Sequence, residues 1–264
     1  MKFFSILTLV LFLLISCLFV NGQVQVEFNQ QNAQGQKVGK WKGFYENGAV
    51  RYVGQFEKDA PQGTFYHYYG DGKLQTKMVY RTSEEAFATI YYSSGEKLAQ
   101  GKYIDKLKDS VWITFGSENR IVETGSYRQG KKEGKWVTFY ETGEVSVEIN
   151  FEDNLKDGPY RMLYGNGQLK DSSNFKGGKL HGYSVIYDSQ GKKVLQGIYN
   201  RSKRDKHWVY YGENQKVDKV LKYIDGQLMN PEDLKVILED VEEFKGNRKD
   251  ILEFEDLRGT ISYE

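Results

Sequence analysis

The sequence predicts an all-β protein in which tandem β-hairpin repeats stack into an elongated twisted sheet. Three observations predict this fold class. The chain has 28 glycines, 20 tyrosines and only 3 prolines, which is typical of a β-rich chain with many turns. Aromatic residues recur every 24 residues, with one spacing of 23. Within each repeat a glycine-bearing turn separates two short aromatic and β-branched runs, the pattern of a β-hairpin.

Eight repeat units occupy residues 39–229, and eight copies at a fixed period are the signature of a repeat architecture. The units start at Gly39, Gly63, Ala86, Ser110, Gly134, Gly158, Gly182 and Lys206. Their third positions, which include all four tryptophans, are Trp41, Phe65, Ala88, Trp112, Trp136, Tyr160, Ser184 and Trp208. An aromatic residue stands at every eighteenth position: Phe56, Tyr80, Tyr103, Tyr127, Phe151, Phe175, Tyr199 and Tyr223.

The fifth unit shows why each repeat should fold as a hairpin. Residues 136–140 and 145–151 are strand-like runs, and a turn with Gly143 joins them. A single hairpin is only marginally stable, so each should bury its aromatic face against its neighbours. Sixteen strands at about 4.8 Å spacing would form a sheet roughly 75 Å long.

Strand parity complicates this simple sheet. The third and sixth positions, such as Trp136 and Phe139, are three residues apart and would point to opposite faces of a regular strand. Either a bulge intervenes or both faces are partly covered. In two units the first apolar residue after the turn comes one place late, at Leu98 and Val194, which also indicates local bulges.

Residues 1–22 form a targeting segment. Lys2 precedes an apolar run that ends near Asn21 and Gly22, as in a secretory signal peptide cleaved before Gln23. Two alternatives remain: a retained membrane anchor, and a lipoprotein signal in which Cys17 would be lipidated. The expected localisation is therefore exported: periplasmic, at the cell surface or secreted.

Both ends of the sheet are expected to be capped. Residues 23–38 are a half-repeat in which Val24, Val26 and Phe28 alternate with polar residues as a short edge strand. Residues 230–246 predict a C-terminal capping α-helix, with Asn230 as its N-cap and Pro231 at the first helical position. Residues 247–264 show no clear period and are expected to be a flexible or loosely docked tail.

Composition excludes several functions. Cys17 is the only cysteine, so the mature chain would have no disulfide or thiol nucleophile. That mature chain would carry 36 basic and 36 acidic residues, interspersed in sign, which argues against nucleic acid. The three histidines fall in separate units, so no metal site or cofactor is expected. Carboxylates share one slot before a new unit, and we expect them to cap turns: Asp109, Glu133, Asp157 and Asp205.

Tyrosines at the seventh position are the candidate binding residues. These are Tyr45, Tyr69, Tyr92, Tyr140 and Tyr164. If this row faces solvent, it offers a rigid contact strip suited to protein or carbohydrate recognition. If it is buried, it belongs to the core.

The units resemble a known family. Residues 39–48 (GKWKGFYENG) and 134–143 (GKWVTFYETG) resemble the variant MORN repeat in its bacterial form, and the resemblance covers about residues 28–226. Proteins with this array are commonly labelled YwqK-family antitoxins, so the resemblance implies a protein partner of the toxin class. A signal sequence, an N-terminal half unit and a C-terminal helix together resemble exported members from Bacteroidetes.

The leading hypothesis is thus a non-catalytic, exported protein-binding module that is antitoxin-like or immunity-like. The alternative is an envelope structural spacer that binds glycan or a membrane surface. Membrane attachment is expected only if Cys17 is lipidated or the N-terminal segment is retained. An enzyme would need side chains from several units to converge on one pocket, and nothing in the spacing requires that.

Overall fold

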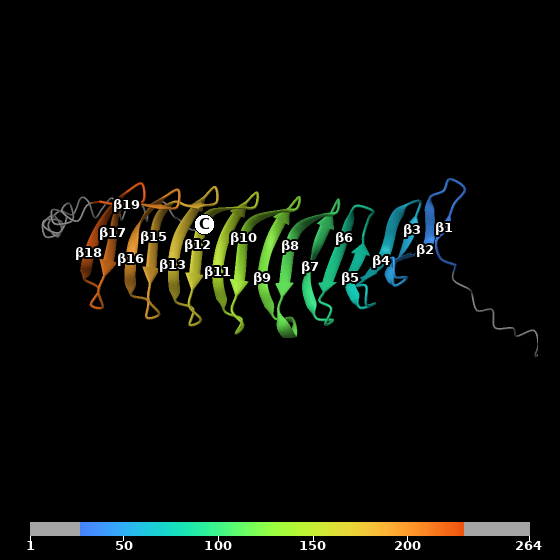
Figure 1. Ribbon diagram of the computed structural model, residues 1–264, viewed down its shortest axis with the longest axis horizontal. Helices are drawn as coiled ribbons and strands as arrows, with labels where there is room; N and C mark the ends of the chain where they lie inside the picture. Colours follow the sequence, from blue (N-terminus) through green and yellow to red (C-terminus); the bar gives the residue numbers. More distant parts are fainter. Residues whose placement is uncertain (1–26, 230–264) are drawn as a thin grey trace, which may run out of the picture.

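A computed structural model describes residues 27–229, which form a sheet of 19 strands (Figure 1). Each strand pairs antiparallel with the next in sequence, except that β13 pairs with both β14 and β15. The strands are β1 (Gln30–Gln31), β2 (Lys37–Phe44), β3 (Val50–Glu57), β4 (Ala60–Tyr68), β5 (Leu74–Tyr80), β6 (Glu85–Tyr91), β7 (Lys97–Ile104), β8 (Leu107–Phe115), β9 (Ile121–Arg128), β10 (Lys131–Phe139), β11 (Val145–Glu152), β12 (Leu155–Leu163), β13 (Leu169–Lys176), β14 (Lys179–Leu180), β15 (Gly182–Tyr187), β16 (Lys193–Asn200), β17 (Lys203–Tyr211), β18 (Val217–Ile224) and β19 (Gln227–Leu228).

The eight predicted hairpins are confirmed, and they lie side by side as an elongated row (Figure 1). Sixteen strands build them once β14 and β15 are counted as one strand interrupted at His181. The short strands β1 and β19 extend the sheet beyond the first and last hairpins. A 3₁₀ turn at Ser117–Asn119 joins the two strands of the fourth hairpin.

Of the residues named for the predicted N-terminal edge strand, Phe28 alone lies in the described range. Phe28 forms an isolated bridge to Lys40, but the paired edge strand is β1, which starts two residues after Phe28. Asn32 closes the turn to β2, because its side-chain oxygen accepts hydrogen bonds from the N–H groups of Gln34 and Gln36, both at 3.0 Å. The predicted signal peptide (1–22), Val24, Val26, the capping helix (230–246) and the tail (247–264) lie outside the described residues.

A bulge lies in every hairpin just before the sixth position, not only in the two units where it was expected. In the fifth unit Thr138 pairs with Val147 but Phe139 pairs with Val145, so Ser146 is an extra residue. Its buried hydroxyl donates a hydrogen bond of 3.1 Å to the Thr138 carbonyl. The buried hydroxyl group of the bulge residue is thus hydrogen-bonded within the sheet.

The third and sixth positions nevertheless lie on opposite faces. Directly paired residues share a face of a sheet. Trp136 pairs with Ile149 on the aromatic face, which carries the third-, sixteenth- and eighteenth-position side chains. Phe139 pairs with Val145 on the other face. The second explanation of the parity is therefore correct: both faces are partly covered, and the bulge residue lies on the partner strand.

A second irregularity joins successive hairpins and positions the tryptophans. Gly101 pairs with Trp112 but Lys102 pairs with Asp109, which leaves two extra residues on β8. The Lys102 carbonyl accepts a hydrogen bond of 3.0 Å from the Trp112 indole N–H. Equivalent indole bonds join Trp136 to the Ser126 carbonyl at 3.1 Å and Trp208 to the Ile198 carbonyl at 3.2 Å.

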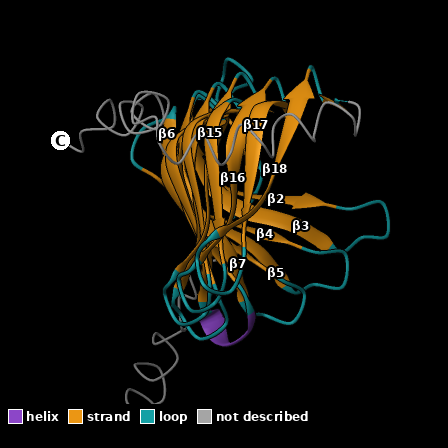
Figure 2. Cartoon of the chain, turned by 90° about the vertical axis from the view of Figure 1, so that its left-hand side faces the viewer, coloured by secondary structure: helices purple, strands orange, loops and turns teal. Residues whose placement is uncertain are grey.

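The pairing of β5 with β6 lacks this irregularity. Its register runs without a shift from Tyr80↔Ala86 to Thr76↔Ile90. This junction is the place where the repeat spacing is 23 rather than 24 residues. Figure 2 shows β2–β5 splayed to one side of the later strands, so the direction of the sheet changes there.

Glycines at the sixteenth position provide the seats for these rings. A Cβ atom on Gly54, Gly101, Gly125 or Gly197 would overlap the third-position ring of the next hairpin. Where the sixteenth position is larger, the next third position is small: Met78 pairs with Ala88. The hydroxyls of Ser173 and Ser184 lie 2.8 Å apart at the corresponding site between the sixth and seventh units. At five of the seven junctions a small residue thus faces a large one, whereas Ile149 and Tyr160 pair as two larger side chains between the fifth and sixth units.

The resulting aromatic row is the core of the protein. Trp112 and Trp136 are each 3% exposed and Trp208 is 0% exposed. The Trp112 ring meets Tyr103 and Tyr127 edge to face, with centroid distances of 5.1 and 6.2 Å. Edge-to-face contacts of this kind add to the stabilisation from burial.

Replacing Gly125 with alanine tests the seat. We expect Gly125→Ala to lower the free energy of unfolding by about 1–3 kcal/mol, because the new methyl group overlaps the Trp136 ring. Gly165→Ala is the matched control, since nothing lies within 4 Å of its added Cβ. Urea unfolding of both variants measures the difference, and equal stabilities would contradict the seat.

Candidate functional site

The seventh-position tyrosines lie at the hairpin turns, along one long side of the sheet, and bridge neighbouring hairpins. The hydroxyls of four of them donate to the sixth-position carbonyl of the next unit. These bonds are Tyr45 to Tyr68 at 2.6 Å, Tyr69 to Tyr91 at 2.7 Å, Tyr140 to Leu163 at 2.6 Å and Tyr164 to Tyr187 at 2.9 Å. Tyr92 makes no such bond to any residue in the range 27–229 and is 41% exposed. The polar ends of four tyrosines are thus already used within the protein.

Three of the four repeated carboxylates, Asp109, Glu133 and Asp157, accept hydrogen bonds from turn N–H groups on the opposite long side of the sheet. The Asp157 carboxylate accepts a 2.8 Å hydrogen bond from the Gly177 N–H. The Asp109 and Glu133 carboxylates accept longer bonds from Gln129 and Asp153. Each donor belongs to the turn of the following hairpin, 20 residues later, so these groups join units rather than close their own turn.

Cations cover the aromatic face next to this long side. Lys132 lies 3.6 Å from the ring centroid of Trp136, and Lys108 lies 4.1 Å from that of Trp112. Arg204 lies 4.5 Å from that of Trp208. Burial lowers the pKa of Lys108, and the charge of nearby Lys132 lowers it further. These cations shield the rings, so the aromatic face offers little apolar area for a partner.

An uncovered apolar area lies on the other face, over the first three hairpins. We name it the basic–apolar surface; it consists of Lys42, Phe44, Val53, Tyr66, Tyr68, Lys77, Val79 and Phe87. Phe44 is 52% exposed and Phe87 is 46% exposed, although both are large apolar side chains. Exposed apolar side chains that gather on one face mark interaction sites.

Strand register makes this surface continuous. Lys42 pairs with Val53, Val53 with Tyr66, and Tyr66 with Lys77. Val79 pairs directly with Phe87 across the unbulged junction of β5 and β6. Directly opposed side chains lie about 4.5–5.5 Å apart at Cβ, so the surface crosses five strands without interruption.

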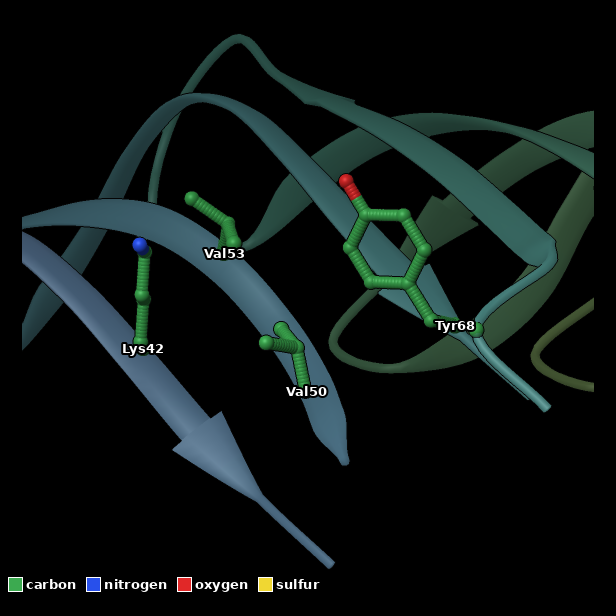
Figure 3. Close-up of a pocket in the computed structure, with 5 residues that line it drawn as sticks. Lys42, Val50, Val53 and Tyr68 are labelled. Carbon is green, nitrogen blue, oxygen red and sulfur yellow. The ribbon is translucent and has the colours of Figure 1, made fainter. Parts of the chain in front are cut away.

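A shallow hollow of ≈350 Å³ opens in this surface. Its lining comes from Lys42, Val50, Val53, Tyr68 and Gly72. Figure 3 shows Lys42, Val53 and Tyr68 reaching to the same side of the sheet, from three neighbouring strands. The hollow combines apolar walls with an ammonium group and a phenol, and so could accept an apolar side chain beside an anion.

Charge distinguishes the middle of this face from the basic–apolar surface. At β10–β12 Glu148 pairs with Lys135 at 2.6 Å and with Arg161 at 3.0 Å. The Lys135 hydrogen bond, followed by the charges of Lys135 and Arg161, lowers the pKa of Glu148 against the opposing effect of burial. Lys42 and Lys77 have no carboxylate partner among residues 27–229, so their charges stay uncompensated there.

Residues 27–229 contain no group of three His, Cys, Asp or Glu side chains placed to hold a metal ion. His67 lies between the rings of Tyr52 and Phe65, at centroid distances of 5.9 and 6.4 Å. In the same range no helix is long and apolar enough to span a bilayer.

Three hairpins match a known repeat. The family model described as "MORN repeat variant" matches residues 37–58, 61–81 and 132–153. These segments correspond to β2–β3, β4–β5 and β10–β11. The two N-terminal variant MORN repeats are those that carry most of the basic–apolar surface. No curated protein matches the sequence.

Similarity to solved structures is weak. The crystal structure of TarM is 12% identical over 48% of this chain and 21% of its own, with a TM-score of 0.25. An S. aureus TarM mutant in complex with fondaparinux, alpha-GlcNAc-glycerol and UDP is 12% identical over 50% and 21%, with a TM-score of 0.24. TcdB2-TccC3-Cdc42 is 12% identical over 71% and 14%, with a TM-score of 0.18. The chain therefore spans about a fifth or less of these proteins, and no function is transferred from them.

Sequence reasoning singled out the tyrosine row and missed the basic–apolar surface. The tyrosines recur at one position, whereas the surface draws on second, fourth, sixth, fifteenth and seventeenth positions. Only the strand register brings Tyr66, Val79 and Phe87 together. The sixteenth-position glycines were also missed, although their recurrence at Gly54, Gly101, Gly125 and Gly197 was visible in the repeat alignment.

Removing one tyrosine hydroxyl tests the bridging role. We expect Tyr140→Phe to lower the free energy of unfolding by about 1 kcal/mol, because the Leu163 carbonyl loses its donor. Tyr92→Phe should leave the stability unchanged. Thermal unfolding of the two variants, measured side by side, checks this; an equal loss would contradict the bridge.

The pH dependence of stability provides a further test. Burial lowers the pKa of His67, and the charge of Arg51 adds to the effect. The unfolded chain therefore binds a proton more readily, so this stability is complete above about pH 6.5 and falls as the pH drops through that value. We expect His67→Gln to weaken the loss of melting temperature between about pH 7 and pH 5. Replacing the exposed His181 with glutamine should leave this loss of melting temperature unchanged. If His67→Gln loses as much melting temperature as the parent over this pH range, the prediction is contradicted.

Proposed function

We propose that this chain is a non-catalytic, exported repeat protein that binds another protein through the basic–apolar surface. The observation that supports this most strongly is the exposure of four large apolar side chains there: Phe44, Tyr66, Val79 and Phe87. The other aromatic rows are occupied by packing and by hydrogen bonds between units. Export remains an inference from residues 1–22, and toxin-type partners remain part of the proposal through the variant MORN repeat.

The two uncompensated lysines favour a protein partner with an anionic, partly apolar surface. Apolar side chains supply most of the affinity in protein interfaces, while charges set orientation and association rate. A glycan would need polar groups for its hydroxyls, whereas the centre of this surface is formed by valine, phenylalanine and tyrosine. The envelope spacer therefore ranks second.

A pull-down with the mature chain from Gln23 tests the proposal. Val79→Ser with Phe87→Ser should reduce recovery of a bound protein at least tenfold, because two central apolar contacts are lost. The matched control is Val111→Ser with Val217→Ser, since these valines are 58% and 43% exposed but lie in other hairpins. Circular dichroism establishes that both variants fold.

Three results would count against protein binding through the basic–apolar surface. Both variants could retain the bound protein, which would move the site elsewhere. The parent could recover no protein at all. Finally, it could bind only cell-wall glycan or lipid vesicles, which would support the spacer instead.

A further inference from the structure

Charge is distributed unevenly along the chain. Residues 27–229 contain 31 Lys and Arg against 25 Asp and Glu, whereas residues 230–264 contain 5 against 11. The hairpin array is thus basic by six charges, and the C-terminal 35 residues are acidic by the same amount. Opposite net charges on two parts of one chain favour contact between them or between copies.

One C-terminal segment also matches the basic–apolar surface in its apolar content. Residues 251–257 read ILEFEDL, in which four apolar residues alternate irregularly with three acidic ones. Phe254 stands between Glu253 and Glu255. An apolar side chain flanked by carboxylates is the complement of a hollow with valine walls and an ammonium group at its rim.

We propose that residues 250–257 of a second copy of this chain dock on the basic–apolar surface. Phe254 of that copy enters the hollow between Val50, Val53 and Tyr68. Its flanking carboxylates, Glu253 and Glu255, then meet Lys42 and Lys77. This inference rests on the proposed function, because it names the chemistry that the surface binds: an acidic segment with an apolar anchor.

The length of the C-terminal segment favours docking on a second copy rather than on the same chain. From β18 to β5 the sheet runs twelve strand intervals when β14 and β15 count as one strand, or about 58 Å at 4.8 Å each. A helix over residues 230–246, as the sequence predicts, would cover about 25 Å, and the four residues that follow would add at most about 14 Å. With that helix the segment would fall short of its own N-terminal hairpins. Two copies aligned antiparallel would exchange segments reciprocally and close as a two-fold dimer.

Charge reversal in the full mature chain tests this pairing. Sedimentation velocity over a range of concentrations should show a monomer–dimer equilibrium for the parent. Lys42→Glu with Lys77→Glu should raise the dissociation constant at least tenfold, and so should Glu253→Lys with Glu255→Lys, because each change places like charges opposite each other. Lys176→Glu with Lys192→Glu, at two exposed lysines in the sixth and seventh hairpins, should leave it unchanged.

Mixing the two charge-reversed variants is the decisive experiment. The two reversed variants should be monomeric alone, yet should associate with each other, because an acidic surface then meets a basic segment. Both contacts of the mixed dimer are then complementary, one with reversed charges and one with the native charges, so the mixed dimer should be about as stable as the parent dimer. Raising the salt from about 0.05 to 0.5 M should weaken the parent dimer, since exposed charges are screened.

Several outcomes would overturn the inference. These are a parent that stays monomeric at all concentrations, a dimer that both reversals leave intact, and reversed variants that do not associate when mixed. If the parent stays monomeric but still captures another protein, and the Val79→Ser, Phe87→Ser variant does not, this inference is refuted and the proposed function stands. If the parent dimerises but captures no other protein, binding of a different protein is refuted, and the dimer proposed here stands.

Discussion

The hairpin array depends on the seating of a third-position ring on the backbone of the preceding hairpin, which occurs at Phe65, Trp112, Trp136 and Trp208. A two-stranded hairpin has one thin face to bury and cannot form a core alone. The ring solves this by lying over a sixteenth-position glycine, where the absence of a Cβ lets indole carbons approach the peptide plane. The bulge beside that glycine frees a carbonyl for the indole N–H. Packing and polar satisfaction are thus achieved by the same local irregularity.

In this arrangement, the side chains that first suggest a binding function are engaged in contacts within the protein. The tryptophans are buried, cations cover their outer faces, and the tyrosine hydroxyls join successive units. Apolar side chains that no neighbour covers remain on the opposite face, where the junction of β5 and β6 runs without a bulge. Removing one residue from one repeat therefore changes both the direction of the sheet and the surface it presents.

Much of the fold could be predicted from sequence, because period and turn chemistry are local signals. Eight hairpins follow from the 24-residue spacing, and the late Leu98 and Val194 indicate the bulges. Pairing register was not predictable, since it depends on which hairpin carbonyl each indole reaches. Without register, Val79 and Phe87 are eight positions apart on different strands rather than partners. Alternation at Val24, Val26 and Phe28 likewise carries no information on pairing with β2, which β1 provides at Gln30 and Gln31.

A double-mutant cycle at one seat tests the central claim most directly. Gly125→Met combined with Trp136→Ala recreates the natural combination of Met78 and Ala88 in a different hairpin. Each single change should be destabilising, the first by overlap with the indole and the second by loss of the buried ring. If the rings and seats are matched by volume, the double variant will be more stable than the sum of the single effects by about 1 kcal/mol or more. Strictly additive effects in urea unfolding would mean that ring and glycine do not interact, and the account would fail.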